Sequence, residues 1–435
     1  MLLQSTPGSY EEDTVMSIMS ALLPAVTWLW SLQALLVSVV LIITTVLWRR
    51  SSTAGLPPGP RGLPLVGNLF SLNKDMPLVY QERSKKFGDV FTYYVLGKPW
   101  IILNGFSAIR EALVANADVF SSRPAQPLAF LPDQSARGLL HEPYTPRFKE
   151  LKKFTMSALR DFGVGKKSME GKILEEAQAL SDRKLRKHIR EEIAKHKETF
   201  DPNDIRDYMD AFLLEAKKRE GDENSTFTEE QHVEMVRQLF LAGTDTTATT
   251  LHWAVLFMIL HPDIQQKVQQ EIDSVLGPNQ VPSMEHRSQM PYTEATLSEI
   301  TRMAATAPLA PFHSTSSDVF FRGYRIPEAT AVVVNIWSVL YDPQLWPEPY
   351  KFDPTRFLDD SGKFTRREEI IMFSMGRRLC PGERLAKAEL FLIFSLLLQR
   401  FTFKPPEGSP VPSAKGVFGF VRSPAPFQLV AEPRN

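Results

Sequence analysis

The sequence has 435 residues, of which 43% are hydrophobic, and its 50 basic and 50 acidic side chains give a formal net charge of zero. A chain of this length is too long for one small domain, but it fits one large α-rich domain with an additional anchor. The absence of net positive charge and of any long basic block argues against nucleic acid as the main partner. The single cysteine excludes an internal disulfide and a zinc site built from several cysteines, and it is consistent with a reducing compartment.

The N-terminal region contains a long stretch without charge, residues 14–48. A membrane-spanning helix needs about 20 apolar residues, which this stretch can supply. A cleaved signal peptide is the alternative, but the apolar run is long for one and no clear small-residue cleavage site follows. Arg49–Arg50 closes the stretch and Glu11–Asp13 precedes it, which predicts that the body of the protein is cytosolic. Residues 1–50 are therefore expected to form a membrane anchor, and the glycosylation sequon at Asn224 is expected to stay unmodified.

A proline-rich segment, residues 51–64, follows the anchor and contains the run Leu-Pro-Pro-Gly-Pro-Arg-Gly-Leu-Pro. Consecutive prolines forbid a helix and stiffen the backbone, so this segment is expected to be a hinge before a body at 65–435. The body reads as mostly helical with a minor β region. Helices are expected at Tyr80–Phe87, Ser107–Asn116 and from Pro146, and strands or strand-like pieces at Val90–Leu96, Trp100–Leu103, Phe320–Ile326, Ala331–Asn335, Phe401–Lys404 and Phe418–Val421.

A long helix is predicted from Thr228 to about His261. Thr228-Glu-Glu-Gln resembles a capping box, and Pro262 follows the last expected turn. The stretch Ala242-Gly-Thr-Asp-Thr-Thr247 interrupts this apolar helix with threonine and glycine, which are poor residues for a helix interior. A polar surface turn would explain it. The functional interpretation is a local groove, in which Gly243 leaves room for a diatomic ligand, Thr246 binds that ligand and Asp245 relays protons.

Cys380, the only cysteine, lies between Gly376 and Gly382, whose backbones can adopt conformations closed to other residues. Arg378 is two residues away, and a helix is predicted from Glu383. A nearby positive charge and a helix N-terminus both favour thiolate over thiol, and a shielded thiolate suits a soft metal centre such as a haem iron. A buried, inert thiol is the alternative for a cysteine considered alone.

The pattern Phe-x-x-Gly-x-Arg-x-Cys-x-Gly, from Phe373 to Gly382, resembles the haem-binding loop of the cytochrome P450 monooxygenases. The resemblance implies a P450-like haem-thiolate fold and haem b as the cofactor, with Cys380 as the axial iron ligand. It also implies that Arg378 pairs with a haem propionate and that Phe373 packs near the sulfur. The stretch Ala242–Thr247 matches the oxygen-activation segment of the same family, which gives Asp245 and Thr246 their catalytic roles.

Further positions follow from the resemblance. Glu299 and Arg302, which as an exposed pair would contribute only about 0.3–0.5 kcal/mol, are expected to form a buried cluster with Arg356 that holds the cysteine loop in place. A basic residue at the position of His313 often meets a propionate in this family. The family usually has tryptophan and arginine, both reaching a propionate, where this chain has Phe148 and Lys152, so haem retention is expected to be weaker.

The chain also departs from the family near 182–183, where many tens of residues, including much of the lid over the substrate pocket, are expected but absent. The predicted function is a monooxygenase of the endoplasmic reticulum membrane with a cytosolic catalytic domain. It would take a fatty acid, a steroid or a foreign compound, O2, and electrons from an NADPH-dependent flavoprotein reductase, with cytochrome b5 as an additional partner. Two alternatives stay open: a reductase-independent haem-thiolate isomerase or dehydratase, against which the Asp245–Thr246 pair argues, and a non-catalytic haem binder.

Overall fold

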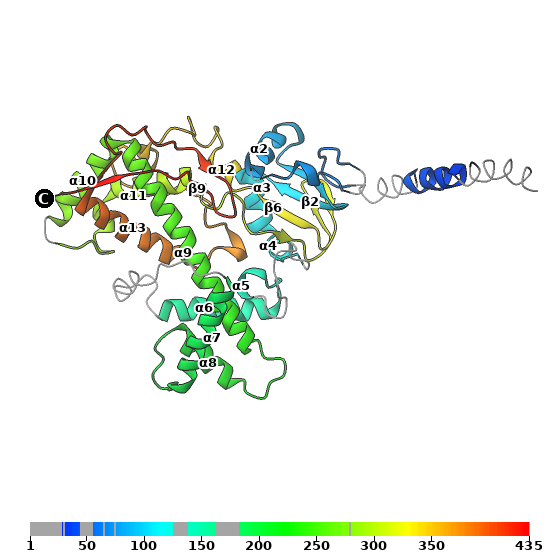
Figure 1. The fold of residues 1–435 in the computed structure, drawn as a ribbon, viewed down its shortest axis with the longest axis horizontal. Coiled ribbons are helices and arrows are strands. Elements are labelled where there is room, and N and C mark those ends of the chain that lie inside the picture. Colours follow the sequence, from blue (N-terminus) through cyan, green and yellow to red (C-terminus); the bar gives the residue numbers. More distant parts are fainter. Residues whose placement is uncertain are drawn as a thin grey trace, which may run out of the picture. The chain divides into compact units, whose positions relative to one another are not determined.

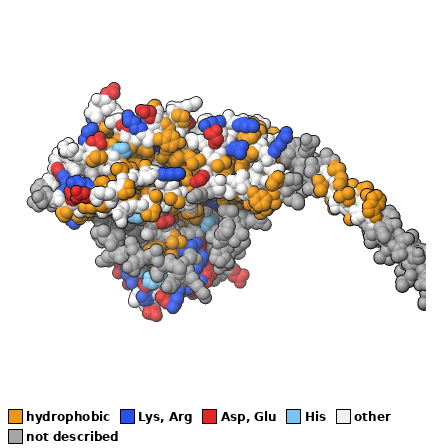
Figure 2. Space-filling view, turned by 45° about the horizontal axis from the view of Figure 1, so that its top comes forward, with side chains coloured by type: hydrophobic (Ala, Val, Ile, Leu, Met, Phe, Trp, Pro, Cys, Tyr) orange, Lys and Arg blue, Asp and Glu red, His pale blue; other side chains and the backbone are white. Residues whose placement is uncertain are grey.

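The computed structural model describes residues 28, 31–43, 55–63, 66–73, 75–124, 138–161, 182–277 and 280–434. The chain forms two compact units, Met1–Leu56 and Pro57–Asn435. In the first unit, residues 31–43 are helical and carry mostly hydrophobic, exposed side chains (Figure 2). Among the described residues, no helix is both long enough and apolar enough to cross a membrane. Much of the predicted span at 14–48 lies outside the described residues.

The second unit is mostly helical, as the sequence predicts. Its α-helices are α2 (Met76–Phe87), α3 (Phe106–Arg110), α4 (Ala117–Phe120), α5 (Gly138–His141), α6 (Pro146–Asp161), α7 (Asp182–Glu198), α8 (Tyr208–Lys218), α9 (Glu229–Leu260), α10 (Pro262–Leu276), α11 (Pro291–Ala304), α12 (Trp337–Leu340) and α13 (Glu383–Arg400). Short 3-10 helices are η1 (Leu69–Ser71), η4 (Arg287–Gln289), η5 (Pro354–Phe357) and η6 (Gly376–Arg378), and η2 (Glu111–Ala115) is a π-helix.

The strands are short. They are β1 (Val90–Val95), β2 (Lys98–Leu103), β3 (His313–Ser314), β4 (Val319–Phe321), β5 (Tyr324–Ile326), β6 (Ala331–Val334), β7 (Phe401–Lys404), β8 (Gly416–Val417), β9 (Ser423–Pro424) and β10 (Val430–Pro433). The main sheet has the order β1-β2-β6-β3, in which β1 and β2 are antiparallel and β2 and β6 are parallel. The other strands form two-stranded pairs.

Helix α9 is the central element of the second unit (Figure 1). Thr228 caps its N-terminus by accepting a hydrogen bond from the backbone N–H of Gln231 at 3.2 Å, so the predicted start of the helix and the predicted long helix are confirmed. The Gln231 side chain contacts Arg147 instead of closing a reciprocal capping box. One end of α9 packs with α10, α11 and α13, and the other end with α5, α7 and α8. A buried apolar cluster that includes Trp253, Phe257 and Phe394 holds the first of these ends.

The strands at Val90–Leu96 and Trp100–Leu103 are confirmed as β1 and β2. The helix predicted at Ser107–Asn116 is observed as α3 followed by the π-helical η2. The β region predicted at Phe418–Val421 is wrong in position, because these residues connect β8 to β9, which pair on either side of them.

Candidate functional site

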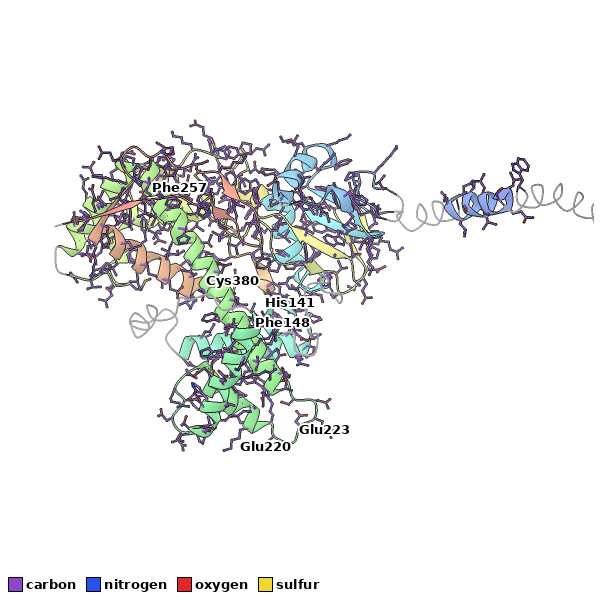
Figure 3. All side chains as sticks on the ribbon, in the orientation of Figure 1. His141, Phe148, Glu220, Glu223, Phe257 and Cys380 are labelled. Carbon is purple, nitrogen blue, oxygen red and sulfur yellow. The ribbon has the colours of Figure 1, made fainter. Side chains whose placement is uncertain are left out.

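The loop around Cys380 is tightly folded against neighbouring backbone. The backbone N–H of Cys380 donates to the carbonyl of Phe373 at 2.9 Å, and helix α13 begins three residues after the cysteine. Gly376 has a φ of +70°, and a Cβ atom there would lie 1.9 Å from the carbonyl oxygen of Leu113. Only glycine fits this position, because any side chain would collide with that carbonyl. Figure 3 shows Cys380 in the region of the middle part of α9.

Burial raises the pKa of the Cys380 thiol, and the Glu383 carboxylate raises it further, while the backbone N–H groups of Gly382 and Glu383 act in the opposite direction. The loop therefore aims N–H groups at the sulfur, as predicted. Arg378 is not among the groups that shift this pKa, and its guanidinium is directed to main-chain carbonyls. A metal that binds the sulfur would supply the missing stabilisation of the thiolate.

Arg378 holds three main-chain carbonyls from the segment before α6. Its guanidinium donates to the carbonyls of Ser121 at 2.7 Å and Glu142 at 2.6 Å, with a longer contact of 3.3 Å to Leu139. The same guanidinium lies 3.6 Å from the centre of the Phe148 ring, which is a cation–π contact. Phe148 thus contacts Arg378 directly and supports it without donating a hydrogen bond.

Three further basic side chains lie around Arg378. Arg123 donates to the carbonyls of Leu140, Pro311 and Phe312. Lys152 donates to the carbonyl of Arg377 at 2.5 Å. His313 is buried, and its Nδ1 donates to the carbonyl of Phe120 at 2.7 Å, while its Nε2 has no partner among the described residues. Arg123 is a site residue that the sequence analysis did not identify.

These four side chains, Arg123, Lys152, His313 and Arg378, form a basic cluster in which Arg123 and His313 are buried and Lys152 and Arg378 are half-buried. Burial lowers the pKa of each of them, that of Arg378 to about 10, and the Arg378 charge lowers the pKa values of the other three further. Mutual repulsion of buried cations is unfavourable unless an anion lies among them. Next to a cysteine loop with a single sulfur, such a cluster fits the two carboxylates of a haem. The residues present therefore suit this cofactor.

The predicted oxygen-activation segment lies on the middle of α9. Residues 241–245 are exposed, and a Cβ atom added to Gly243 would meet nothing within 4 Å, so there is open space beside this glycine. The Thr246 hydroxyl donates to the carbonyl of Ala242 at 2.7 Å within its own helix. Asp245 belongs to the exposed stretch.

Glu389 on α13 is a second residue that the sequence analysis missed. It accepts a hydrogen bond from the Thr247 hydroxyl at 3.2 Å and so links α13 to the oxygen-activation segment of α9. Burial raises the pKa of Glu389, and the Thr247 hydrogen bond opposes this shift only partly. The only signal in the sequence is that Glu389 directly precedes the apolar run Leu390–Phe394 of α13.

The structure brings Glu299, Arg302 and Arg356 together. Arg302 forms a bidentate pair with Glu299, with N–O distances of 2.7 and 2.8 Å, and both side chains are fully buried. Arg356 approaches the same carboxylate at 3.5 Å. Arg302 also donates to the carbonyls of Leu340 and Pro349, so it ties α11 to the segments before and after the Trp346 turn.

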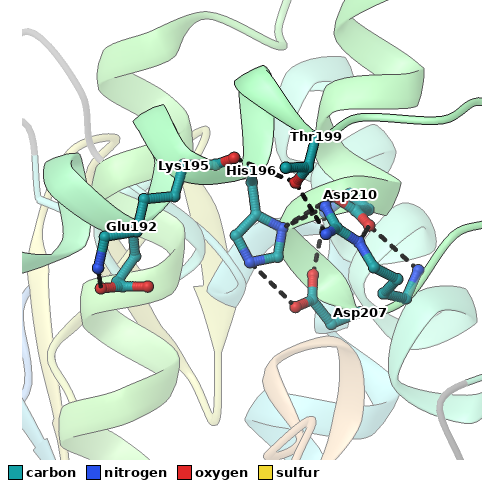
Figure 4. Close-up of polar contacts among 7 residues, drawn as sticks. Glu192, Lys195, His196, Thr199, Asp207 and Asp210 are labelled. Atoms are coloured by element: carbon teal, nitrogen blue, oxygen red, sulfur yellow. Dashed lines mark hydrogen bonds and ion pairs between the residues drawn. The ribbon is translucent and has the colours of Figure 1, made fainter.

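One other cluster of potential metal ligands consists of His196, Asp207 and Asp210 (Figure 4). His196 lies with Nδ1 2.8 Å from Asp210 and Nε2 3.3 Å from Asp207. Arg206 already binds both Asp210 oxygens, at 2.5 and 2.8 Å. The Asp207 carboxylate caps α8. We interpret this group as an ion-pair cluster that fastens the turn between α7 and α8.

Comparison with known proteins gives the family. The family model "Cytochrome P450" matches residues 57–188 and 182–431. Cytochrome P450 2D6 of Homo sapiens is 35% identical, in an alignment that covers 92% of this chain and 98% of that protein. Cytochrome P450 2D4 of Rattus norvegicus is also 35% identical, covering 95% and 100%, and vitamin D(3) 25-hydroxylase of Sus scrofa is 36% identical, covering 93% and 99%.

The same comparisons bear on the shortened region. The two matches to the family model meet and overlap at 182–188. The alignment with the human relative has 490 positions, whereas 92% of 435 residues is about 400, so about 90 positions of the alignment have no residue from this chain. Both findings are consistent with a central segment missing near 182–183. Over the rest of its length this chain belongs to the cytochrome P450 family, whose members are monooxygenases that hold a haem b iron by an axial cysteine thiolate.

Proposed function

We propose that this protein is a membrane-bound monooxygenase that inserts one oxygen atom from O2 into a small lipophilic substrate, such as a fatty acid, a steroid or a foreign compound. Electrons would come from an NADPH-dependent flavoprotein reductase, with cytochrome b5 as an additional donor. The observation that carries the proposal is the basic cluster beside the Cys380 loop, in which two cations are buried and two are half-buried and which suits an anionic partner. One of the relatives above bears the name vitamin D(3) 25-hydroxylase.

Each residue then has a defined task. Cys380 would hold the iron, and Phe373 and the two glycines would shape the loop around the sulfur. Arg378, Arg123, Lys152 and His313 would hold the haem carboxylates, His313 through the Nε2 atom that has no partner among the described residues. Haem held in this way supplies the electron-transfer chemistry by which dioxygen is activated.

Asp245 and Thr246 would deliver protons to the site. The Thr246 hydroxyl donates to Ala242 within its helix, and rotation of its side chain would free it for a ligand in the groove at Gly243. Glu389 would hold Thr247 and thereby fix the turn of α9 that carries both residues. The Glu299–Arg302–Arg356 cluster would keep the cysteine loop in position rather than take part in the chemistry.

Turnover assays separate this proposal from its alternatives. The full chain with a flavoprotein reductase should consume NADPH in proportion to oxygenated product from at least one lipophilic compound in a panel. A reductase-independent isomerase would convert its substrate without NADPH. A non-catalytic haem binder would do neither and would still give a haem spectrum. The exposure of the oxygen-activation segment does not favour the isomerase or the non-catalytic haem binder over the monooxygenase.

The electron donor would dock on a basic surface near the cysteine loop. Lys149 and Lys153 are exposed and lie one turn apart on α6, and Arg384 is exposed at the start of α13. Lys152 and Lys387 lie on the same two helices but are engaged with the carbonyl of Arg377 and with Glu383. Charge reversal of Lys149 and Lys153 should slow turnover driven by the reductase and leave turnover driven by added peroxide intact, because only docking depends on these charges. Equal loss in both assays would contradict a docking role.

The proposed location is the endoplasmic reticulum membrane, with the catalytic unit in the cytosol. Asn224 offers a direct test of this orientation, because it is exposed in the turn after α8 and belongs to a glycosylation sequon. The protein from a eukaryotic host should show no glycosidase-sensitive mobility shift. A shift that disappears in Asn224→Gln would place the catalytic unit on the lumenal side.

A further inference from the structure

A cleft of about 620 Å³ lies between the proline-rich hinge, the turn at η1, helix α2 and strand β1. It belongs entirely to the second unit and lies on segments that none of the proposed catalytic residues occupies. Its floor is formed in part by Asn68 and Tyr93, which are buried. The Tyr93 hydroxyl is 2.7 Å from the Ser71 hydroxyl, and Asn68 accepts a hydrogen bond from the backbone N–H of Tyr94 at 2.9 Å. The cleft therefore has a fixed, polar base.

Three cations line the cleft from two different segments: Arg61 from the hinge, and Arg83 and Lys86 from α2. No acidic side chain lies among the described residues that line it. The neighbouring Lys85 is neutralised by Glu82 at 2.6 Å, whereas the structure records no ion pair for Arg61, Arg83 or Lys86 within its described part. Cations that converge on a hollow with hydroxyl groups at its base form a site for a phosphate group.

Three exposed apolar side chains lie within three residues, along the chain, of residues that line the cleft. Phe70 is 79% exposed and precedes Ser71, and Leu63 is 58% exposed two residues after Arg61. Leu96 is 64% exposed, and its backbone N–H bonds to the carbonyl of Val66, while Leu63 pairs with Gly67. One hydrogen-bonded turn system thus presents these three side chains to solvent. A soluble phosphate ester would leave these apolar side chains in water. A phospholipid can bury them, because its acyl region lies next to its phosphate.

The backbone geometry makes this arrangement rigid. The hinge joins the sheet through the backbone N–H of Thr92 to the carbonyl of Pro58 at 2.9 Å, and through the Thr92 hydroxyl to the carbonyl of Pro57 at 2.7 Å. A Cβ atom on Gly59 would lie 1.9 Å from the carbonyl oxygen of Thr92. The hinge is therefore packed directly on β1, which fixes the backbone two residues before Arg61.

We propose that this cleft binds the phosphate-bearing headgroup of an anionic phospholipid, with Leu63, Phe70 and Leu96 entering the acyl region. The inference rests on the proposed membrane attachment, since it assigns a lipid to a site that begins a few residues after the apolar first unit in the sequence. The proline-rich hinge would then take part in recognising a lipid headgroup, whereas its composition alone indicates only a stiff linker.

The test uses the full, haem-loaded chain in three settings: phosphatidylcholine vesicles, vesicles that also contain phosphatidylserine, and phosphatidylcholine vesicles with added inorganic phosphate. Amide hydrogen exchange is measured at residues 59–63 and 83–93. Phosphatidylserine should slow exchange in both segments. The triple variant Arg61→Gln, Arg83→Gln, Lys86→Gln should lose this protection, with headgroup binding weaker on the order of 100-fold for three cations near an anionic surface.

A matched variant, Lys267→Gln, Lys363→Gln, Lys415→Gln, removes three exposed lysines that lie outside the cleft and should keep the protection. The proposal is overturned if both triple variants behave alike, if phosphatidylserine protects neither segment in the unmodified chain, or if inorganic phosphate alone reproduces the protection. The carbon monoxide spectrum of each variant reports intact haem ligation. Hydrogen-exchange protection is measured without turnover. A negative result for lipid binding would therefore leave the monooxygenase proposal standing, and a loss of turnover would not affect the test of lipid binding.

Discussion

Replacing Glu299 by glutamine tests the buried cluster that we propose holds the cysteine loop. The carboxylate accepts two hydrogen bonds from Arg302 at 2.7 and 2.8 Å and one from the backbone N–H of Asp353 at 3.0 Å, and it lies 3.5 Å from Arg356. Glutamine keeps the shape but removes the charge, and its amide hydrogens would face the guanidinium. Arg302 is fully buried and has no other anion among its described contacts.

Breaking a buried ion pair by changing one partner typically costs about 3–5 kcal/mol, because the remaining charge stays buried without compensation. We expect Glu299→Gln to lower the free energy of unfolding by an amount in this range, measured by urea titration of the detergent-solubilised chain with circular dichroism. The matched control is Glu432→Gln, which breaks an exposed pair with Lys404 and should cost less than about 1 kcal/mol.

The reasoning is refuted if Glu299→Gln and Glu432→Gln give the same loss. A second readout addresses the cysteine loop itself. If the cluster positions that loop, the carbon monoxide spectrum of Glu299→Gln should show a smaller thiolate-type fraction, whereas that of Glu432→Gln should be unchanged. A large loss of stability with a fully retained thiolate-type spectrum would assign the cluster to the stability of α11 alone.

Three further predictions concern the site. The double variant Phe148→Trp, Lys152→Arg should bind haem more tightly, by roughly 0.5–3 kcal/mol, because it adds one or two hydrogen bonds to a charged group. Slower transfer of haem to apomyoglobin would show this gain. Unchanged transfer would contradict a propionate role for these positions. Thr246→Ala should keep haem but release more hydrogen peroxide per NADPH consumed, and an unchanged ratio of product to NADPH would count against its role in proton delivery. Glu389 has a raised pKa in the folded protein, so its contribution to stability is present below its ordinary value of 4.5 and is lost as the pH rises through the raised value. Glu389→Gln should therefore gain melting temperature relative to the unmodified protein as the pH is raised above 4.5, and a constant difference across this range would refute the assignment.

Elements whose signals are local were predictable from the sequence. The Thr228 cap and Pro262 bound α9 to within one residue of each end, because both signals act through adjacent backbone groups. Strands β1 and β2, which are rich in β-branched and aromatic residues, and the helix after Gly382 were predictable for the same reason. The spacing of Glu299 and Arg302 gave their pairing, but only tertiary structure buries that pair completely.

What the sequence did not reveal depends on contacts between distant segments. Arg378 donates to the carbonyls of Ser121 and Glu142, more than 200 residues earlier in the chain, and the local sequence does not indicate these partners. Arg123 and Glu389 become site residues only where the loop before α6 and helix α13 meet their partners. The residues Phe418–Val421 have strand-forming composition, yet the pairing of β8 with β9 makes them a turn.

The most direct test of the account is the carbon monoxide difference spectrum of the reduced, full-length protein, compared with that of Cys380→Ser. The account predicts a thiolate-type spectrum for the unmodified chain and its complete loss in the variant, because the chain has no other cysteine. A thiolate-type spectrum that persists in Cys380→Ser, or that is absent from the unmodified haem-loaded chain, would contradict the assignment of Cys380 as the iron ligand and with it the proposed monooxygenase function.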